Sequence, residues 1–145
     1  MKVLFICHAN VARSQIAQEY FNKLTGGQAT SAGTAVNSLG LKKVNDSQYK
    51  RSIQFVKEIM DIDISENKTT QLTQSLVEEQ DVVIAILQRD QFLPWLINHP
   101  KVTWWDIKDT PVLDNEAAYE VWYEVMRKVN DLVAHFNVVV NNNNV

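Results

Sequence analysis

Two short apolar runs without a polar interruption constrain the fold of this chain more than any other feature. Val3–Ile6 and Val82–Leu87 lack the alternation of a strand with one wet face. Both are therefore predicted as central strands of a parallel sheet that is buried on two faces. A third run, Val102–Trp105, predicts another strand, and Thr30–Thr34 resembles the end of a short strand and its turn.

Between these runs, apolar residues recur every three or four positions, which is typical of amphipathic helices. The first such pattern follows Cys7 and ends at Gly26 and Gly27. The remaining patterns are Tyr49, Ile53, Val56 and Met60; Leu72, Leu76 and Val77, ending near Gln80; a short piece at Phe92, Trp95 and Leu96 near Pro94; and the long stripe Ala118, Val121, Trp122, Val125, Val129, Leu132, Val133 and Phe136. Alternating strands and helices predict an α/β fold with a three-layer, doubly wound parallel sheet.

The length and the composition both favour one folded domain. The chain has 145 residues, of which 46% are hydrophobic and 21% charged, close to the average of soluble globular proteins. Neither a linker nor a repeat divides the chain. We expect a single domain over residues 1–137 and a flexible tail over residues 138–145, which ends in the low-complexity stretch NNNNV.

The charge and the N-terminus exclude several classes of partner and location. A net charge of −3 argues against nucleic acid or an anionic membrane as a partner. Apolar runs stay well short of the roughly 20 residues that cross a bilayer. The first residues, MKVLFICHANVARS, turn polar too early for a signal peptide. The sequence therefore predicts a cytoplasmic protein.

Cys7 is the single cysteine of the chain, so it cannot form an internal disulfide. One cysteine and three scattered histidines also lack the spacing of a zinc site. A lone cysteine is commonly a small buried hydrophobe. Its position favours another role, because ligands of doubly wound sheets bind beyond the carboxyl ends of the strands, and Cys7 directly follows the first strand.

The residues after Cys7 suit a tetrahedral oxyanion. A short loop that curves into a helix N-terminus points backbone N–H groups inward, and the guanidinium of Arg13 can hold two oxygens. These groups favour the thiolate of Cys7, which is then ready for in-line attack. Asn10 tolerates a left-handed backbone, and Ser14 can either cap the helix or hydrogen-bond the sulfur. We predict Cys7 as the nucleophile and a binding loop of His8, Ala9, Asn10, Val11, Ala12, Arg13 and Ser14.

The stretch Ile6–Ser14 resembles the Val-Cys-x-Gly-Asn-x-Cys-Arg-Ser pattern of the low-molecular-weight protein tyrosine phosphatases and the arsenate reductases built on the same fold. Further similar segments are Ser31–Thr34, Asp61–Ser65, Gln71–Thr73 and Asp81–Ile84. The resemblance implies the phosphotyrosine protein phosphatase I-like fold, with four parallel strands and flanking helices. It also implies that Cys7 attacks while Arg13 and the loop amides cradle the oxyanion. That chemistry requires no cofactor and no metal.

The general acid is expected in the segment that follows the fourth strand. The family takes this carboxylate from an Asp-Pro pair, and the chain has Asp109-Thr110-Pro111 in that region. Asp109 is the predicted acid because Trp-x-Ile-x-Asp resembles the reductase-like branch, and Asp106 is the alternative. Asp114, just ahead of the last helix, is expected to cap that helix. Lys42, Lys43, Lys50 and Arg51 are interpreted as a solvated basic face.

Three departures from the family pattern bear on the activity. Ala9 replaces the loop glycine, Ala12 replaces the second loop cysteine, and Val112–Leu113 stand where phosphatases of the family carry tyrosines. The sequence favours hydrolysis of phosphomonoesters, either on phosphoproteins, including phosphotyrosine, or on small phosphoesters, through a cysteinyl-phosphate. The alternatives are an arsenate reductase that uses Cys7 with an external thiol, and a non-catalytic regulatory protein that binds phosphate, arsenate or a similar oxyanion.

Overall fold

A computed structural model describes residues 1–143, with side chains through Asn137. Its centre is a four-stranded sheet in the order β2-β1-β3-β4, and every neighbouring pair of strands is parallel. The strands are β1 (Val3–Cys7), β2 (Thr30–Gly33), β3 (Val82–Ile86) and β4 (Val102–Trp105). The strand order runs outward in both directions from the β1–β3 pair, so the predicted doubly wound parallel sheet is confirmed.

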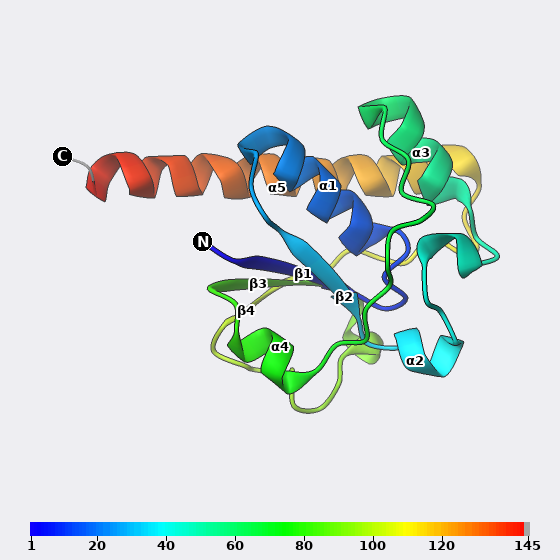
Figure 1. Cartoon of the computed structure of the whole chain (residues 1–145), viewed down its shortest axis with the longest axis horizontal. Helices are drawn as coiled ribbons and strands as arrows, with labels where there is room; N and C mark the ends of the chain where they lie inside the picture. Colours follow the sequence, from blue (N-terminus) through cyan, green and yellow to red (C-terminus); the bar gives the residue numbers. More distant parts are fainter. Residues whose placement is uncertain (144–145) are drawn as a thin grey trace.

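Helices cover both faces of this sheet (Figure 1). On one face lie α1 (Arg13–Thr25), α3 (Arg51–Met60) and the long α5 (Asn115–Asn143). The opposite face carries the short helix α4 (Gln74–Glu78). Two further short elements, α2 (Val36–Leu39) and the 3₁₀ helix η1 (Val44–Asp46), lie in the connection between β2 and α3.

The central strands have no wet face, as their apolar runs predict. Every residue of β1 is buried, and the strand divides its side chains between two cores. Val3 and Phe5 join the core beneath α1, α3 and α5, whereas Leu4 and Ile6 join the core on the α4 side. Burial on both faces explains why the run contains no polar residue.

One expected helix is absent. Phe92–Leu96 forms extended and turn structure, and the helical turn nearby is the 3₁₀ helix η2 (Arg89–Gln91), which ends before Phe92. Pro94 explains the difference, because the residue before a proline is disfavoured in helical geometry. Likewise α3 begins at Arg51, and Tyr49 lies outside it with 47% of its surface exposed.

The last helix, α5, follows the long apolar stripe and continues to Asn143. The predicted flexible tail over residues 138–145 falls on the end of this helix and on two residues outside the described range, so it stays a prediction. Among the described residues, none of the helices combines the length and the apolar character that crossing a membrane requires.

Candidate active site

Cys7 lies at the carboxyl end of β1, at the start of a loop that leads into α1. Residues 7–14 are called the cysteine loop below. The thiol is buried, with 2% of the residue exposed, and its sulfur lies 2.9 Å from the Ser14 hydroxyl oxygen. The backbone N–H of Asn10 also donates to the sulfur, at 3.3 Å. Both groups can donate a hydrogen bond to the sulfur. Of the two roles expected for Ser14, the structure shows the hydrogen bond, and α1 has no side-chain cap.

Asn10 fixes the shape of the cysteine loop. Its backbone adopts the left-handed conformation with a φ of 59°, as the sequence predicts for an asparagine at this place. Its side chain is fully buried and makes three hydrogen bonds: Nδ2 donates to Ser14 Oγ at 2.7 Å and to Ser31 Oγ at 2.9 Å, and Oδ1 accepts from the Thr70 N–H at 3.0 Å. The side chain therefore joins the loop to β2 and to the segment before α4.

Gly33, at the end of β2, packs against the same loop. A Cβ atom at this position would lie 2.7 Å from the His8 carbonyl oxygen and 2.9 Å from the Asn10 nitrogen, so a side chain does not fit. The next two residues continue the contact: the Thr34 N–H donates to the Cys7 carbonyl and the Ala35 N–H to the His8 carbonyl. The Ser31–Thr34 segment thus supports the cysteine loop from the neighbouring strand.

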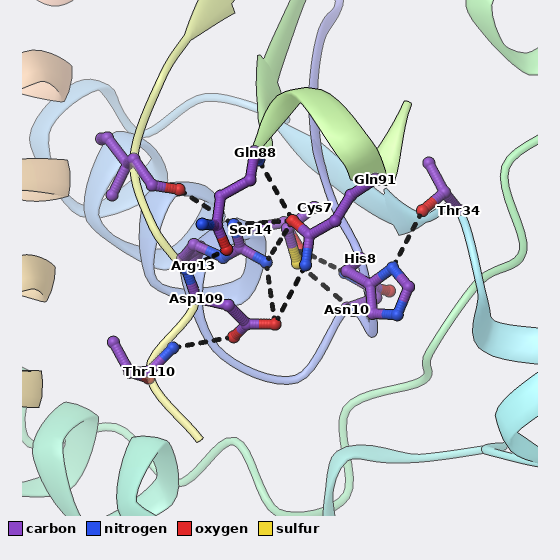
Figure 2. Close-up of polar contacts among 11 residues, drawn as sticks. Cys7, His8, Asn10, Arg13, Ser14, Thr34, Gln88, Gln91, Asp109 and Thr110 are labelled. Carbon is purple, nitrogen blue, oxygen red and sulfur yellow. Dashed lines mark hydrogen bonds and ion pairs between the residues drawn. The ribbon is translucent and has the colours of Figure 1, made fainter. Parts of the chain in front are cut away.

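Arg13, the last loop residue before Ser14, is 2% exposed and its guanidinium is held by two other segments. Nη1 donates to the Ile107 carbonyl at 3.0 Å, and Nη2 forms an ion pair with Asp109 Oδ2 at 3.3 Å. Nη1 and Nη2 also donate to the side-chain oxygen of Gln91 (Figure 2). The arginine therefore points toward the ends of β3 and β4, where the predicted acid lies.

Asp109 is the carboxylate that reaches this site, and it is partly exposed at 31%. One oxygen contacts Arg13 and Gln91, and the other accepts from the Thr110 N–H at 2.9 Å. Asp106, the alternative acid, is exposed and does not line the cleft that Asp109 lines. Asp114 caps α5 by accepting from the Ala117 N–H at 2.8 Å, as expected.

Gln88 and Gln91 are site residues that sequence reasoning missed. Gln88 precedes η2 and Gln91 is its last residue, shortly after β3, and Figure 2 shows their side chains beside Arg13 and Asp109. Gln88 Oε1 accepts from the Asp109 N–H at 3.1 Å, and Gln91 Nε2 donates to Asp109 Oδ2 at 3.3 Å. A usable signal existed, because η2 follows the strand next to β1 at the switch point of the sheet, where ligands bind.

A cleft of about 580 Å³ opens beside the cysteine loop. Cys7, Asn10 and Arg13 are buried and do not line it. The lining residues come from the loop, from the connection between β2 and α3, from η2 and from the segment after β4: His8, Ala9, Val11, Ala12, Leu39, Leu41, Asp46, Ser47, Gln48, Tyr49, Arg51, Ser52, Gln91, Asp109, Thr110, Pro111 and Trp122. Most of this wall is apolar. Asp46 is one of its polar residues, and the backbone N–H groups of Lys43 and Lys42 lower the pKa of its carboxyl.

The start of α3 contacts both the cysteine loop and the segment that carries Asp109. Ser52 is buried, and its hydroxyl donates to the Val11 carbonyl at 2.6 Å. Arg51 donates to the carbonyl of Leu113 and, at 3.4 Å, to that of Pro111. The interpretation of Arg51 as part of a solvated basic face is therefore wrong, because its side chain holds the segment that carries Asp109 and also lines the cleft.

Comparisons with known structures agree with this fold. A low molecular weight protein tyrosine phosphatase from T. tengcongensis superposes with a TM-score of 0.74 at 22% identity, over 93% of this chain and 99% of that chain. Wzb from Vibrio vulnificus, in complex with benzylphosphonate, gives a TM-score of 0.72 at 20% identity, over 92% and 97%. An arsenate reductase in its phosphate-binding state gives 0.74 at 26% identity, over 92% and 97%.

Curated protein sequences offer no match. The family model of the low molecular weight phosphotyrosine protein phosphatases, by contrast, matches residues 2–140, which is nearly the whole chain. The chain therefore belongs to the low molecular weight phosphotyrosine protein phosphatase family.

Proposed function

We propose that this protein hydrolyses phosphomonoesters through a phosphorylated Cys7. The observation that carries the proposal is the convergence, beside one cleft, of a buried cysteine, a buried arginine and a partly exposed carboxylate. These three groups supply a nucleophile, an oxyanion cradle and an acid. The first two come from the cysteine loop, and the third comes from the segment after β4.

In the first step the thiolate of Cys7 attacks phosphorus in line with the leaving oxygen. The Ser14 hydroxyl and the Asn10 N–H, at 2.9 and 3.3 Å from the sulfur, stabilise the thiolate before attack. Arg13 and the N–H groups of the cysteine loop hold the phosphoryl oxygens. These hydrogen bonds strengthen as negative charge shifts onto the oxygens in the transition state. Asp109 donates a proton to the departing alkoxide.

The size of the cleft favours an ester over a bare oxyanion. A volume of about 580 Å³ lies within the range of sites for whole small molecules, roughly 300–1,000 Å³, and exceeds what inorganic phosphate or arsenate fills. Its apolar lining, which includes Leu39, Leu41 and Tyr49, suits the alcohol part of a phosphoester, on a small molecule or on a phosphoprotein side chain.

The proposal is tested by the hydrolysis of an aryl phosphate. The purified protein should release phosphate and alcohol, and Cys7→Ser should abolish this turnover. Asp109→Asn should slow esters with poor leaving groups at least about 100-fold, but activated aryl esters much less, because only the former require the proton. Asp106→Asn is the matched control and should leave both rates unchanged. Absence of turnover with every aryl and alkyl phosphate tested would exclude the phosphatase reaction.

Arsenate reduction is the second candidate, because the arsenate reductase in its phosphate-binding state is the most similar in sequence of the three compared structures, at 26% identity. With one cysteine in the chain, a Cys7 adduct must be attacked by an external thiol. This function predicts arsenite release that depends on an added thiol and on Cys7. Binding of phosphate that depends on Arg13, without either reaction, would instead identify an oxyanion-binding regulatory protein.

A further inference from the structure

We propose that Gln91 positions the water that hydrolyses the phosphorylated Cys7. This inference rests on the proposed function and adds to it a group for the second half of the reaction. Gln91 is half-buried, ends η2 and lines the cleft, and Figure 2 shows its amide beside both the Arg13 guanidinium and the Asp109 carboxylate.

The Gln91 amide oxygen is hydrogen-bonded to the Arg13 guanidinium. It accepts from Arg13 Nη1 at 3.3 Å, from Arg13 Nη2 at 3.2 Å and from the Gln88 N–H at 3.1 Å. The guanidinium thus binds an uncharged oxygen. A phosphoryl group is the stronger acceptor because it is charged, so it displaces Gln91 Oε1 from Arg13 when Cys7 becomes phosphorylated.

This exchange frees the amide oxygen at the moment when water must enter. Gln91 Nε2 lies 3.3 Å from Asp109 Oδ2, so the amide and the carboxylate are close enough to share one water molecule. The water can donate one hydrogen bond to Asp109 and the other to Gln91 Oε1. When both groups hold the water, a lone pair of its oxygen faces the cysteine loop. This is a near-attack geometry, which accelerates a displacement.

The hydrolytic step regenerates the thiolate of Cys7. The water oxygen attacks phosphorus, and one water proton passes to the Asp109 carboxylate, which lost its proton to the leaving group in the first step. The sulfur–phosphorus bond breaks, its electron pair returns to Cys7 Sγ as the thiolate, and inorganic phosphate leaves. Gln91 gains and loses no proton, so its contribution is geometric and is confined to this half-reaction.

The backbone keeps the amide at this place. The Gln91 N–H donates to the Gln88 carbonyl at 2.9 Å, which closes the single turn of η2. Gln88 in turn accepts from the Asp109 N–H through its side chain, so the turn and the acid are joined independently of the Gln91 amide. Replacement of that amide should therefore leave Asp109 attached to η2 and able to act in the first step.

The test separates the two half-reactions with p-nitrophenyl phosphate as the probe. Rapid mixing gives the rate at which Cys7 is phosphorylated, and acid quenching with mass spectrometry gives the fraction of phosphorylated chain at steady state. In Gln91→Met, which keeps the side-chain length, phosphorylation should change less than about threefold. Hydrolysis should slow at least about tenfold, so that the phosphorylated fraction rises. In the presence of added glycerol, the ratio of glycerol phosphate to phosphate formed should also differ between Gln91→Met and the unchanged protein.

Gln54→Met is the matched control, because Gln54 is an exposed glutamine of α3 whose amide donates a hydrogen bond to the exposed Glu58. Its two rates should equal those of the unchanged protein. Equal slowing of both half-reactions in Gln91→Met, or no slowing of hydrolysis, overturns the inference and leaves the proposed function intact. Failure of the unchanged protein to hydrolyse the probe removes the proposed function and the inference with it.

Discussion

Replacement of Asn10 by alanine tests whether one buried side chain maintains the cysteine loop. Alanine removes three hydrogen bonds, to Ser14, Ser31 and Thr70, and places a residue without a local polar side chain at a φ of 59°. Glycine removes the same three bonds but adopts positive φ without strain. The pair of variants therefore separates the contribution of the side chain from that of the backbone.

The expected magnitudes follow from these contacts. Each of the three hydrogen bonds is worth about 1 kcal/mol, so Asn10→Gly should lower the free energy of unfolding by about 3 kcal/mol. The left-handed conformation costs alanine a further ~1 kcal/mol, so Asn10→Ala should lose about 4 kcal/mol. Both losses are large beside the 5–15 kcal/mol or so that stabilises an ordinary domain.

Urea unfolding at equilibrium measures the two values, with Asn37→Ala as the control. Asn37 lies on the exposed side of α2, and its replacement should change stability by less than about 0.5 kcal/mol. A loss below about 1 kcal/mol for Asn10→Ala contradicts the role given to its hydrogen bonds. Equal losses for the glycine and alanine variants would contradict only the backbone contribution and leave the role of the hydrogen bonds intact.

Two further variants test how neighbouring segments support the site. Gly33→Ala places a Cβ atom 2.7 Å from the His8 carbonyl oxygen, so it should cost about 1–3 kcal/mol of stability and weaken phosphate binding about tenfold, measured by unfolding and by calorimetry; unchanged phosphate affinity would mean that the loop tolerates the added atom. Arg51→Met removes the donor to the carbonyls of Leu113 and Pro111, so kcat/KM for alkyl phosphates should fall about tenfold and that for p-nitrophenyl phosphate less. Equal effects on both esters would show that Arg51 does not help to position Asp109.

The fold was predictable because its strongest signals are local. A strand buried on both faces cannot carry polar residues, so Val3–Ile6 and Val82–Leu87 identify the two strands at the centre of the sheet. The absence of helix at Phe92–Leu96 shows the limit of periodicity, since three apolar residues near Pro94 match a helix that the proline prevents.

The candidate site was predictable where neighbours in sequence carry it. The positions of Cys7, Asn10, Arg13 and Ser14 follow from a strand, a tight loop and a helix in succession. Gln91 and Arg51 escaped prediction because they reach the site through the packing of distant elements. In the sequence, Gln91 resembles any polar residue of a turn, and Arg51 resembles any exposed cation. Only the meeting of η2 and α3 with the β4–α5 segment gives these two side chains their partners.

The most direct test of the account is detection of the intermediate on Cys7. Asp109→Asn should be mixed with p-nitrophenyl phosphate, quenched in acid within the first turnover and examined by mass spectrometry of its peptides. We expect the added mass of one phosphoryl group on the peptide that contains Cys7, and none on the same peptide of Cys7→Ala. Release of p-nitrophenol by the unchanged protein, with no phosphoryl group on Cys7 at any quench time in Asp109→Asn or in the unchanged protein, would contradict this expectation.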